Sequence, residues 1–460
     1  MEKQTVSIEQ ETKSPKLGVK SWIVIWVAGI AGQLCWNIEN QWFNTFVYAK
    51  IAPNPSIITW MVAVSAIVST LSTFISGTGS DRLGRRKPFI VVGYILWGVF
   101  TIVFGVTEFL PIKNVLAMAT MVIVADAIMS FFGSLGNDAG FNPWTTDITN
   151  ERNRGGLGAV IAVQPVLATI IGSLGGGFII GALDYIWFFV IMGTFVIGVG
   201  IYSAFAVKDS PNLKPNRDEK GYWHQFGQAF NFKLLAKNKL LLIVLCIFAM
   251  FFISFNVYFP HMLNLFIYTY GYDTGMAGVL LGVGLVVAIP LTLIASKFIN
   301  KQKFVPVASV AVLLNILGLI IMSLSKFAGN RTALTTTIII ATFFVGGGYM
   351  VFYQALMIWC KNLYPEEQRG QLEGVRLFFY VCIPMVLGPA IANPVIKNLG
   401  KPVTLLYDNV PIDGFAPSIE LLYVSIAVAF LTFIPLYIAY RYQKNHPEVK
   451  NDAKTETETA

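Results

Sequence analysis

Long apolar runs follow one another along most of the chain, and short polar stretches separate them. The hydrocarbon core of a bilayer requires about 20 predominantly apolar residues per helix, so each run predicts one membrane-spanning helix. The pattern predicts twelve such helices, at residues 21–48, 57–79, 89–109, 114–138, 157–182, 186–207, 240–268, 275–297, 305–325, 332–361, 373–397 and 419–441. We therefore expect an all-α membrane protein whose even number of crossings leaves both termini on one side.

One polar stretch, residues 208–239, is longer than the others and divides the predicted helices into six and six. Its prolines and its charged run at Arg217–Lys220 are typical of a solvated linker, and residues 222–232 could form an amphipathic helix on the membrane surface. The chain is thus predicted to contain an N-terminal tail at 1–20, a six-helix bundle at 21–207, this linker, a second six-helix bundle at 240–441 and a C-terminal tail at 442–460.

Basic residues predict the orientation of the bundle. Of the 33 Lys and Arg residues, 27 lie on the side that the termini share, and only 6 lie on the other. Lys and Arg accumulate in cytoplasmic loops. We therefore expect a multi-pass protein of the cell membrane with both termini in the cytoplasm.

The overall composition excludes several classes of protein. The chain is 55% hydrophobic and 13% charged, with a mean hydropathy of +0.63, which is too apolar for an ordinary soluble globule. The net charge of +8 comes from residues between apolar runs, so it indicates topology and not a nucleic-acid partner. The sequence has no P-loop lysine, no His-Glu-x-x-His, no Gly-x-Ser-x-Gly and no zinc-type cysteine spacing. We therefore expect a protein that is not an enzyme and that binds no metal or cofactor. Because no ATPase motif is present, any movement of a solute against its gradient must draw on an ion gradient.

The segment from Gly77 to Pro88 packs five charges into a short turn between two apolar runs. Its glycines and proline allow a tight reversal at a membrane face. The segment resembles the loop between the second and third helices of major facilitator superfamily transporters. Its Arg-Arg-Lys-Pro-Phe ending, which begins at Arg85, is similar to the glycoside/cation symporter and sucrose-transporter branches.

An internal repeat supports this resemblance. Residues 154–160 and 369–375 share the pattern R-G-x-L-x-x-V at an offset of 215 residues, and the same offset carries the charged turn onto the basic residues 296–303. Parallel six-helix repeats are typical of major facilitator transporters. The resemblance implies two six-helix pseudo-repeat bundles with a central site and alternating access.

Polar residues in the first predicted helix recur at helical spacing. Gln33, Asn37, Asn40, Gln41 and Asn44 form one stripe, with Trp36 at its border. Amides and an aromatic ring suit a sugar, because they offer hydrogen bonds to hydroxyls and a flat face to the ring. The alternative is that the amides bond to neighbouring helices.

Two carboxylic acids, Glu39 and Asp126, fall well inside predicted helices and away from their ends, where ionisable groups are costly. Glu39 lies about 140° from the centre of the amide stripe, so a regular helix points it at a neighbouring helix. Asp126 lies near the middle of the fourth helix. Either acid could carry a coupling ion or serve as a structural partner. The second helix has no carboxylate, which favours a proton over sodium as the coupling ion.

Acidic residues at and after the inner end of the fourth predicted helix are expected on the same membrane face as the charged turn. We expect Asp138, Asp147 and Glu151 to pair with Arg82, Arg85 or Arg86 and to close the cytoplasmic side in one state, although substrate contact is an alternative for these acids. The predicted cytoplasmic gate also includes Asp81, Arg152, Arg369 and Arg376. Arg376 is expected to pair with Glu366, Glu367 or Glu373.

The second half offers fewer candidates. Predicted substrate contacts are Asn256 and Tyr258 in the seventh helix, and Tyr353 and Gln354 in the tenth. His261 could titrate or make a structural hydrogen bond. Clustered glycines such as Gly172, Gly176 and Gly278 predict close helix packing.

Together these features predict a secondary active transporter, functional as a monomer in a lipid bilayer, that moves a small-molecule substrate. A sugar or glycoside carried with protons is the leading hypothesis. Alternatives are a carrier of another small solute, including proton-coupled drug efflux, and a multi-helix membrane sensor or intramembrane enzyme.

Overall fold

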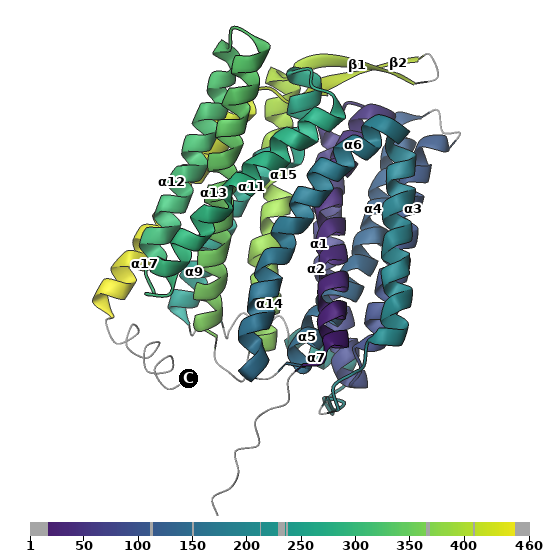
Figure 1. The fold of residues 1–460 in the computed structure, drawn as a ribbon, viewed down its shortest axis with the longest axis vertical. Coiled ribbons are helices and arrows are strands. Elements are labelled where there is room, and N and C mark those ends of the chain that lie inside the picture. Colours follow the sequence, from purple (N-terminus) through teal and green to yellow (C-terminus); the bar gives the residue numbers. More distant parts are fainter. Residues whose placement is uncertain are drawn as a thin grey trace, which may run out of the picture.

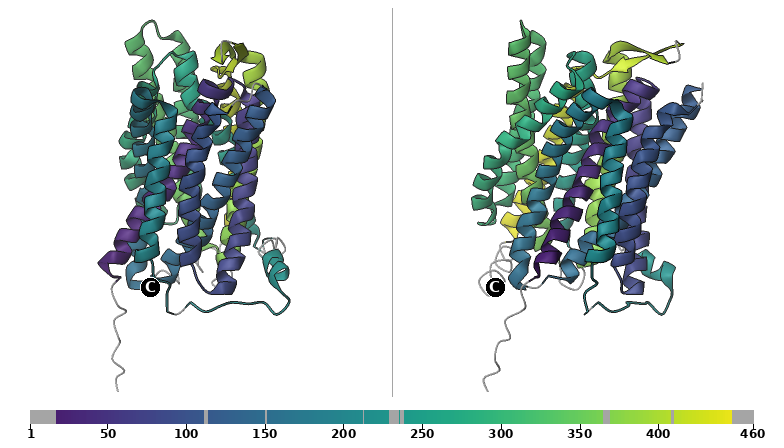
Figure 2. Two further views of the ribbon diagram at one scale, coloured as in Figure 1. Left: turned by 90° about the vertical axis from the view of Figure 1, so that its right-hand side faces the viewer. Right: turned by 45° about the vertical axis from the view of Figure 1, so that its right-hand side comes forward.

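The computed structural model describes residues 17–446 apart from 111–113, 150, 212, 229–234, 236–237, 365–368 and 408–409. Two groups of membrane-length helices lie side by side (Figure 1, Figure 2). The N-terminal half contains α1 (Val19–Phe46), η1 (Val47–Ile51), α2 (Pro55–Leu83), α3 (Lys87–Val106), η2 (Thr107–Phe109), α4 (Val115–Gly136), η3 (Asn137–Phe141), α5 (Asn142–Asp147) and α6 (Glu151–Ala206).

The C-terminal half follows a linker that carries the short helix α7 (Tyr222–Gln228). It contains α9 (Lys239–Tyr258), η4 (Phe259–His261), α10 (Met262–Asn264), η5 (Leu265–Thr269), α11 (Thr274–Ile299), α12 (Phe304–Ser323), η6 (Leu324–Phe327), α13 (Arg331–Asn362), α14 (Arg369–Leu377), η8 (Phe378–Cys382), α15 (Ile383–Leu399), β1 (Lys401–Tyr407), β2 (Val410–Ala416), α16 (Glu420–Leu431) and α17 (Phe433–Asn445).

Eleven helical segments among the described residues are long and apolar enough to cross a membrane. One of them, Gly156–Ala206, contains two crossings because α6 turns sharply at Asp184, where φ is 72° and ψ is 170°. The segments therefore supply the twelve crossings that the apolar pattern predicts.

The bundle has two distinguishable ends (Figure 1). We call the end that carries β1 and β2 the hairpin end. The opposite end, where α1 begins and α17 finishes, is the terminal end. The leucines of the two R-G-x-L repeats, Leu157 and Leu372, are both buried where α6 and α14 begin.

The β1–β2 hairpin is an element that the apolar pattern does not predict. Its strands pair antiparallel from Lys401 with Ala416 to Tyr407 with Val410. Strands of seven residues are too short to register in a search for membrane-length helices, so the sequence shows only a loop here.

The hairpin belongs to the C-terminal half but is bonded to the N-terminal half. The Phe415 amide donates to the Pro53 carbonyl at 2.9 Å, and the Tyr48 hydroxyl donates to the Phe415 carbonyl at 2.8 Å. Gly414 lies so close to the Pro53 carbonyl that a Cβ atom there would collide with it. The hairpin therefore lies directly against the loop that precedes α2.

Helices of the two halves also meet at the hairpin end. The Asn264 side chain donates to the Asn44 carbonyl at 3.1 Å, and the Thr274 hydroxyl donates to the Gly177 carbonyl at 3.2 Å. The Ser56 hydroxyl donates to Asn393 Oδ1 at 3.2 Å. These bonds close the hairpin end in this structure.

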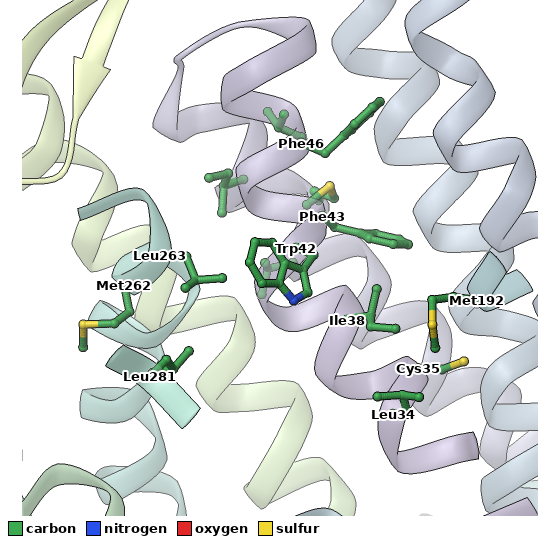
Figure 3. Packing of buried hydrophobic residues seen from close by; sticks show 14 of the residues in the cluster. Leu34, Cys35, Ile38, Trp42, Phe43, Phe46, Met192, Met262, Leu263 and Leu281 are labelled. Carbon is green, nitrogen blue, oxygen red and sulfur yellow. The ribbon is translucent and has the colours of Figure 1, made fainter. Parts of the chain in front are cut away.

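The core near this end mixes aliphatic side chains with the aromatic rings of Trp42, Phe43 and Phe46 of α1 (Figure 3). Phe43 of α1 stacks on Phe104 of α3 at a centroid distance of 3.7 Å. The Trp42 indole donates to the Gly172 carbonyl of α6 at 2.8 Å, and a Cβ atom on Gly172 or Gly176 would overlap α1 side chains. The expected close packing at these glycines is confirmed, and it sets the rotation of α1 against α6.

Candidate functional site

Glu39 and Asp126 form a buried pair of carboxylic acids. Their side chains are only 4% and 1% exposed, and they lie close enough to act on each other electrostatically. Ser130 of α4 donates to Glu39 Oε1 at 2.8 Å. Ser65 of α2 lies near both acids, and its hydroxyl donates to the Val62 carbonyl of its own helix at 3.2 Å. Three helices of the N-terminal half thus converge on one acidic site.

The pair has unused hydrogen-bonding capacity. Among the described residues, Glu39 Oε2 and Asp126 Oδ1 have no hydrogen-bond partner. Buried polar atoms are normally satisfied, so two orphaned carboxyl oxygens in one site are unusual. A proton or a small cation at this site would restore the missing interactions.

The orientation of Glu39 agrees with helical geometry. The sequence places it away from the amide stripe, and the structure points it at α4 and α2. Its pairing with Asp126 is new, because the rotation of α4 relative to α1 follows from packing. The signal that could have suggested the pair is the serines at Ser65 and Ser130, which are polar residues in otherwise apolar helices.

The amide stripe of α1 divides into accessible and buried members. Gln33, Trp36 and Asn40 are partly accessible, whereas Asn37 and Asn44 are buried. Asn44 is covered because its carbonyl accepts from Asn264 where the two halves meet. Gln41 is buried as well, so Asn37, Gln41 and Asn44 are closed off in this conformation, and their contact with substrate stays a prediction.

Accessibility along α1 also changes with depth. Trp26, Ile30, Gln33, Trp36 and Asn40 are partly accessible at steps of three or four residues, and positions 41–48 are all buried. One face of α1 is thus partly accessible from the terminal end up to Asn40, and every position from Gln41 to Tyr48 is buried.

Three of the aromatic and amide candidates are occupied by structural contacts. Trp36 packs against Trp97 at a centroid distance of 4.9 Å. Asn256 is buried and donates to the Phe252 carbonyl of its own helix at 2.8 Å. Tyr258 is buried and accepts a hydrogen bond from Asn315 of α12.

Tyr258 is the last residue of α9, and Pro260 follows it in the short helix η4, where the regular α-helix is interrupted. Asn256 and Tyr258 therefore make packing contacts in this structure, and their contact with substrate stays a prediction. His261, on the same break, is fully buried, and neither ring nitrogen has a partner among the described residues.

Tyr353 and Gln354 of α13 are partly accessible, as a binding role requires. Tyr353 stacks on Tyr349 at 6.2 Å and lies 5.5 Å from the ring of Tyr380. Tyr349 and Tyr380 are not among the residues predicted from the sequence. The spacing of Tyr349 and Tyr353, one helical turn apart, is the signal that could have indicated Tyr349.

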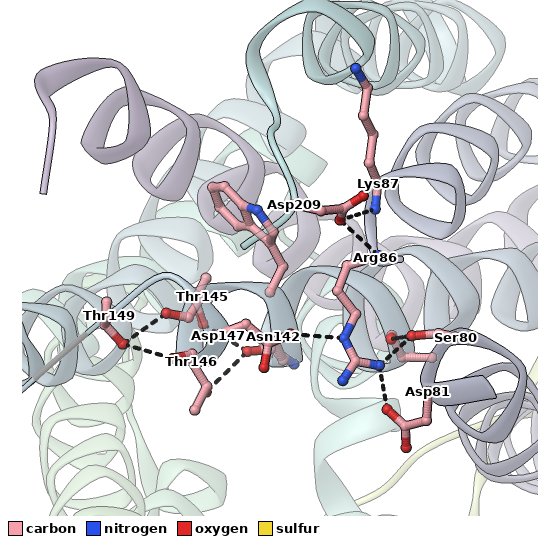
Figure 4. Close-up of polar contacts among 12 residues, drawn as sticks. Ser80, Asp81, Arg86, Lys87, Asn142, Thr145, Thr146, Asp147, Thr149 and Asp209 are labelled. Carbon is pink, nitrogen blue, oxygen red and sulfur yellow. Dashed lines mark hydrogen bonds and ion pairs between the residues drawn. The ribbon is translucent and has the colours of Figure 1, made fainter. Parts of the chain in front are cut away.

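Arg86 is the centre of a polar cluster at the terminal end (Figure 4). It is 7% exposed and pairs with Asp81 at 2.6 Å and with Asp147 at 2.9 Å, and it also donates to Ser80. Burial opposes the charge, but Asp81 and Asp147 raise the pKa of the Arg86 guanidinium above its ordinary value. The predicted pairing of Asp147 with the charged turn is present.

The linker binds the same turn. Asp209 accepts the backbone N–H groups of Arg86 and Lys87 at 2.8 and 2.9 Å, which satisfies the start of α3 (Figure 4). Arg82 donates to Gln225 of α7 at 3.0 Å, not to an acid of the predicted gate. Arg85 is exposed to solvent.

Asp138 differs from its predicted role. It accepts hydrogen bonds from Asn137 at 2.9 Å and Asn142 at 3.4 Å, and the cation that acts on it is Arg376 of the opposite half. Among the described residues, Asp138 forms no ion pair with Arg82, Arg85 or Arg86, so its predicted pairing with the charged turn is absent in this structure. Asp138 lies in the π-helical turn η3.

The halves also meet toward the terminal end. The ring of Phe74 lies against Gly374, where a Cβ atom would overlap it. The side chains of Glu151, Arg152 and Arg369, and the predicted partners Glu366, Glu367 and Glu373, lie outside the described part of the structure.

A family model described as Major Facilitator Superfamily matches residues 22–389. The chain belongs to the Major Facilitator Superfamily. The predicted fold is thereby confirmed, and the protein is a multi-pass membrane transporter and not an enzyme. No curated protein sequence matches the chain.

Solved structures share this fold. The nucleoside transporter NupG is 10% identical, with a TM-score of 0.66 over 91% of this chain and 99% of that chain. A D-xylose-proton symporter is 12% identical, with a TM-score of 0.65 over 90% and 97%. A bacterial homologue of the human lysosomal transporter Spinster, in an inward-facing and unoccupied conformation, is 13% identical, with a TM-score of 0.63 over 93% and 98%. At these identities the likeness shows the fold alone.

Proposed function

We propose that this transporter is a proton-coupled symporter of a sugar or glycoside that works by alternating access. It would act as a monomer in the cell membrane with its terminal end in the cytoplasm. The observation that carries the proposal is the buried pair of Glu39 and Asp126, in which Glu39 lies on the same helix as the amides of α1.

The pair suits a proton on electrostatic grounds. Burying an ionised carboxylate costs free energy, and the cost grows when a second carboxylate lies beside it. One proton held between Glu39 and Asp126 lowers this charge. Because the acids belong to different helices, loading and releasing the proton changes how α1 and α4 attract each other, which is what coupling requires.

Substrate polarity supports a sugar. Gln33 and Asn40 are partly accessible amides, and Asn40 lies one residue from Glu39. Amide groups pair with hydroxyls as both donors and acceptors. A pocket for lipophilic drugs would need less polar walls, so efflux of such drugs is the weaker candidate. The D-xylose-proton symporter shows that the fold accommodates this chemistry, although fold transfers substrate poorly.

Uptake into proteoliposomes tests the proposal. A panel of radiolabelled sugars is offered with an imposed pH gradient, with an imposed sodium gradient and with neither. We expect saturable uptake that the pH gradient drives uphill. Saturable flux of no sugar would refute the substrate class, and accumulation driven only by sodium would refute the proton.

Two variants test the acids directly. Asp126→Asn and Glu39→Gln should abolish gradient-driven accumulation while leaving exchange of substrate across the membrane. Glu420→Gln, at the start of α16, is the matched control for losing one carboxylate. Uphill accumulation at the wild-type level in both variants would remove the pair from the mechanism.

A further inference from the structure

Three tyrosines of the C-terminal half form one connected group. Tyr349 and Tyr353 stack along α13 at 6.2 Å, and Tyr380 of η8 lies 5.5 Å from Tyr353. We call these residues the tyrosine platform.

Phenylalanines of α9 hold the platform in place. Phe252 contacts Tyr380 edge-on at 4.6 Å, and Phe255 stacks on Tyr349 at 4.8 Å. Such ring contacts fix orientation as well as bury area. The tyrosine rings are therefore supported from one side and partly accessible on the other.

The accessible side of the platform faces the interior. Ile340 of α13 is 44% exposed among apolar neighbours, and nine residues along a helix turn Tyr349 about 180° away from it. Between them, Gly346 and Gly348 pack against α11 and α12. Tyr349 thus points away from the lipid-facing side of its helix.

Tyr380 lies where the two halves meet. The π-helical turn η8 packs against α2, and Gly374, which shortly precedes this turn, lies under Phe74 of α2. The turn that carries Tyr380 is therefore in contact with the N-terminal half, which holds the acid pair. A substrate bound between the halves would touch both.

Resting on the proposed function, we propose that the tyrosine platform selects a ring-shaped substrate over an open-chain one. A pyranose has a flat face of C–H groups, which packs on an aromatic ring, and hydroxyls around its edge. The platform supplies the flat aromatic surface, and the Tyr349, Tyr353 and Tyr380 hydroxyls can pair with hydroxyls at the edge of the sugar. An alditol carries similar hydroxyls but has no fixed flat face, so packing on the tyrosine rings contributes little to its binding free energy.

The test compares pyranosides with alditols of the same carbon number in proteoliposomes under an imposed pH gradient. Wild-type protein should favour the pyranoside by at least about tenfold in KM. Tyr380→Leu and Tyr349→Leu remove a ring and should reduce that preference to about threefold or less, whereas Tyr380→Phe and Tyr349→Phe should keep it. Tyr437→Leu, on the exposed face of α17, is the control.

The outcomes separate this inference from the proposed function. If neither class of solute is taken up by wild-type protein, the proposed function is refuted and the platform with it. If both are taken up equally, or if the leucine variants keep the preference for rings, only the platform is refuted. Should the leucine variants fold poorly, thermal stabilisation of detergent-purified phenylalanine variants and wild type by each solute gives the preference directly, and equal stabilisation by rings and alditols overturns the inference.

Discussion

Ser130 of α4 donates a 2.8 Å hydrogen bond to Glu39 of α1, and this bond joins two helices beside the acid pair. Ser130→Ala removes the donor and leaves a buried carboxyl oxygen without its partner. We expect a loss of about 1–3 kcal/mol in the free energy of unfolding, because hydrogen bonds to charged or buried groups contribute on this scale. Thermal unfolding in detergent measures it, with Thr120→Ala on the exposed face of α4 as the control. A cost no greater than that of Thr120→Ala would contradict the role given to Ser130.

Arg86→Lys tests the polar cluster at the terminal end. Lysine can reach one acid as a point charge but cannot bond to Asp81 and Asp147 in two directions as the guanidinium does. We expect a lower unfolding temperature, equivalent to about 1–3 kcal/mol. Arg85→Lys, at an exposed neighbouring position, should change stability by less than about 0.5 kcal/mol. Equal effects at the two positions would contradict the account.

Gly414→Val should detach the hairpin from the loop that precedes α2. The new side chain has no room beside the Pro53 carbonyl, and overpacking of this kind costs about 1–3 kcal/mol. Because these contacts help to close the hairpin end, we expect faster alkylation of a cysteine introduced at Asn44. Gly329→Val, where a Cβ meets nothing within 4 Å, is the control. An unchanged alkylation rate would show that the hairpin does not restrain this end.

The linker should respond to acid through Asp218. The His224 side chain, 2.6 Å away, and the Lys220 backbone N–H lower the pKa of the Asp218 carboxyl below its ordinary value. A carboxyl whose pKa is lower in the folded state stabilises it fully above the unfolded pKa of about 4, and this is lost as pH falls through the folded pKa. His224→Ala should therefore shift the acid-induced release of α7 to higher pH.

Emission from a fluorophore attached at a cysteine replacing Gly227 reports that release. Glu219→Gln is the control, because Glu219 is an exposed neighbour of Asp218. This variant should leave the pH of half-maximal release of α7 unchanged. A midpoint that moves to lower pH in His224→Ala would reverse the sign of the argument.

Much of the fold follows from the sequence because membrane helices are specified by length and apolarity. The apolar runs predicted both limbs of α6 even though the structure joins them at Asp184. The hairpin was not predictable in this way, since its alternating strands carry a weak signal beside the helices. The local geometry of one helix also sufficed to turn Glu39 away from the amide stripe.

Contacts between elements were less predictable than the elements. The pairing of Glu39 with Asp126 depends on how α4 rotates against α1, and glycines buried at helix contacts set such rotations. Asp138 was predicted to meet the charged turn because both lie at the same membrane face, but its hydrogen bonds come from Asn137 and Asn142 within the π-helical turn and the helix that follows it. Irregular helical turns of this kind leave little trace in a hydropathy pattern.

The hairpin gives experimenters a handle on the transport cycle. Leu406 and Val410 are 70% and 61% exposed, so the strands can be reached from outside the bundle while Phe415 remains bonded to Pro53. An antibody fragment raised against the hairpin together with the Pro53 loop would recognise only the arrangement in which they touch. Such a reagent would trap the transporter with its hairpin end shut and add mass for cryo-electron microscopy of that single state.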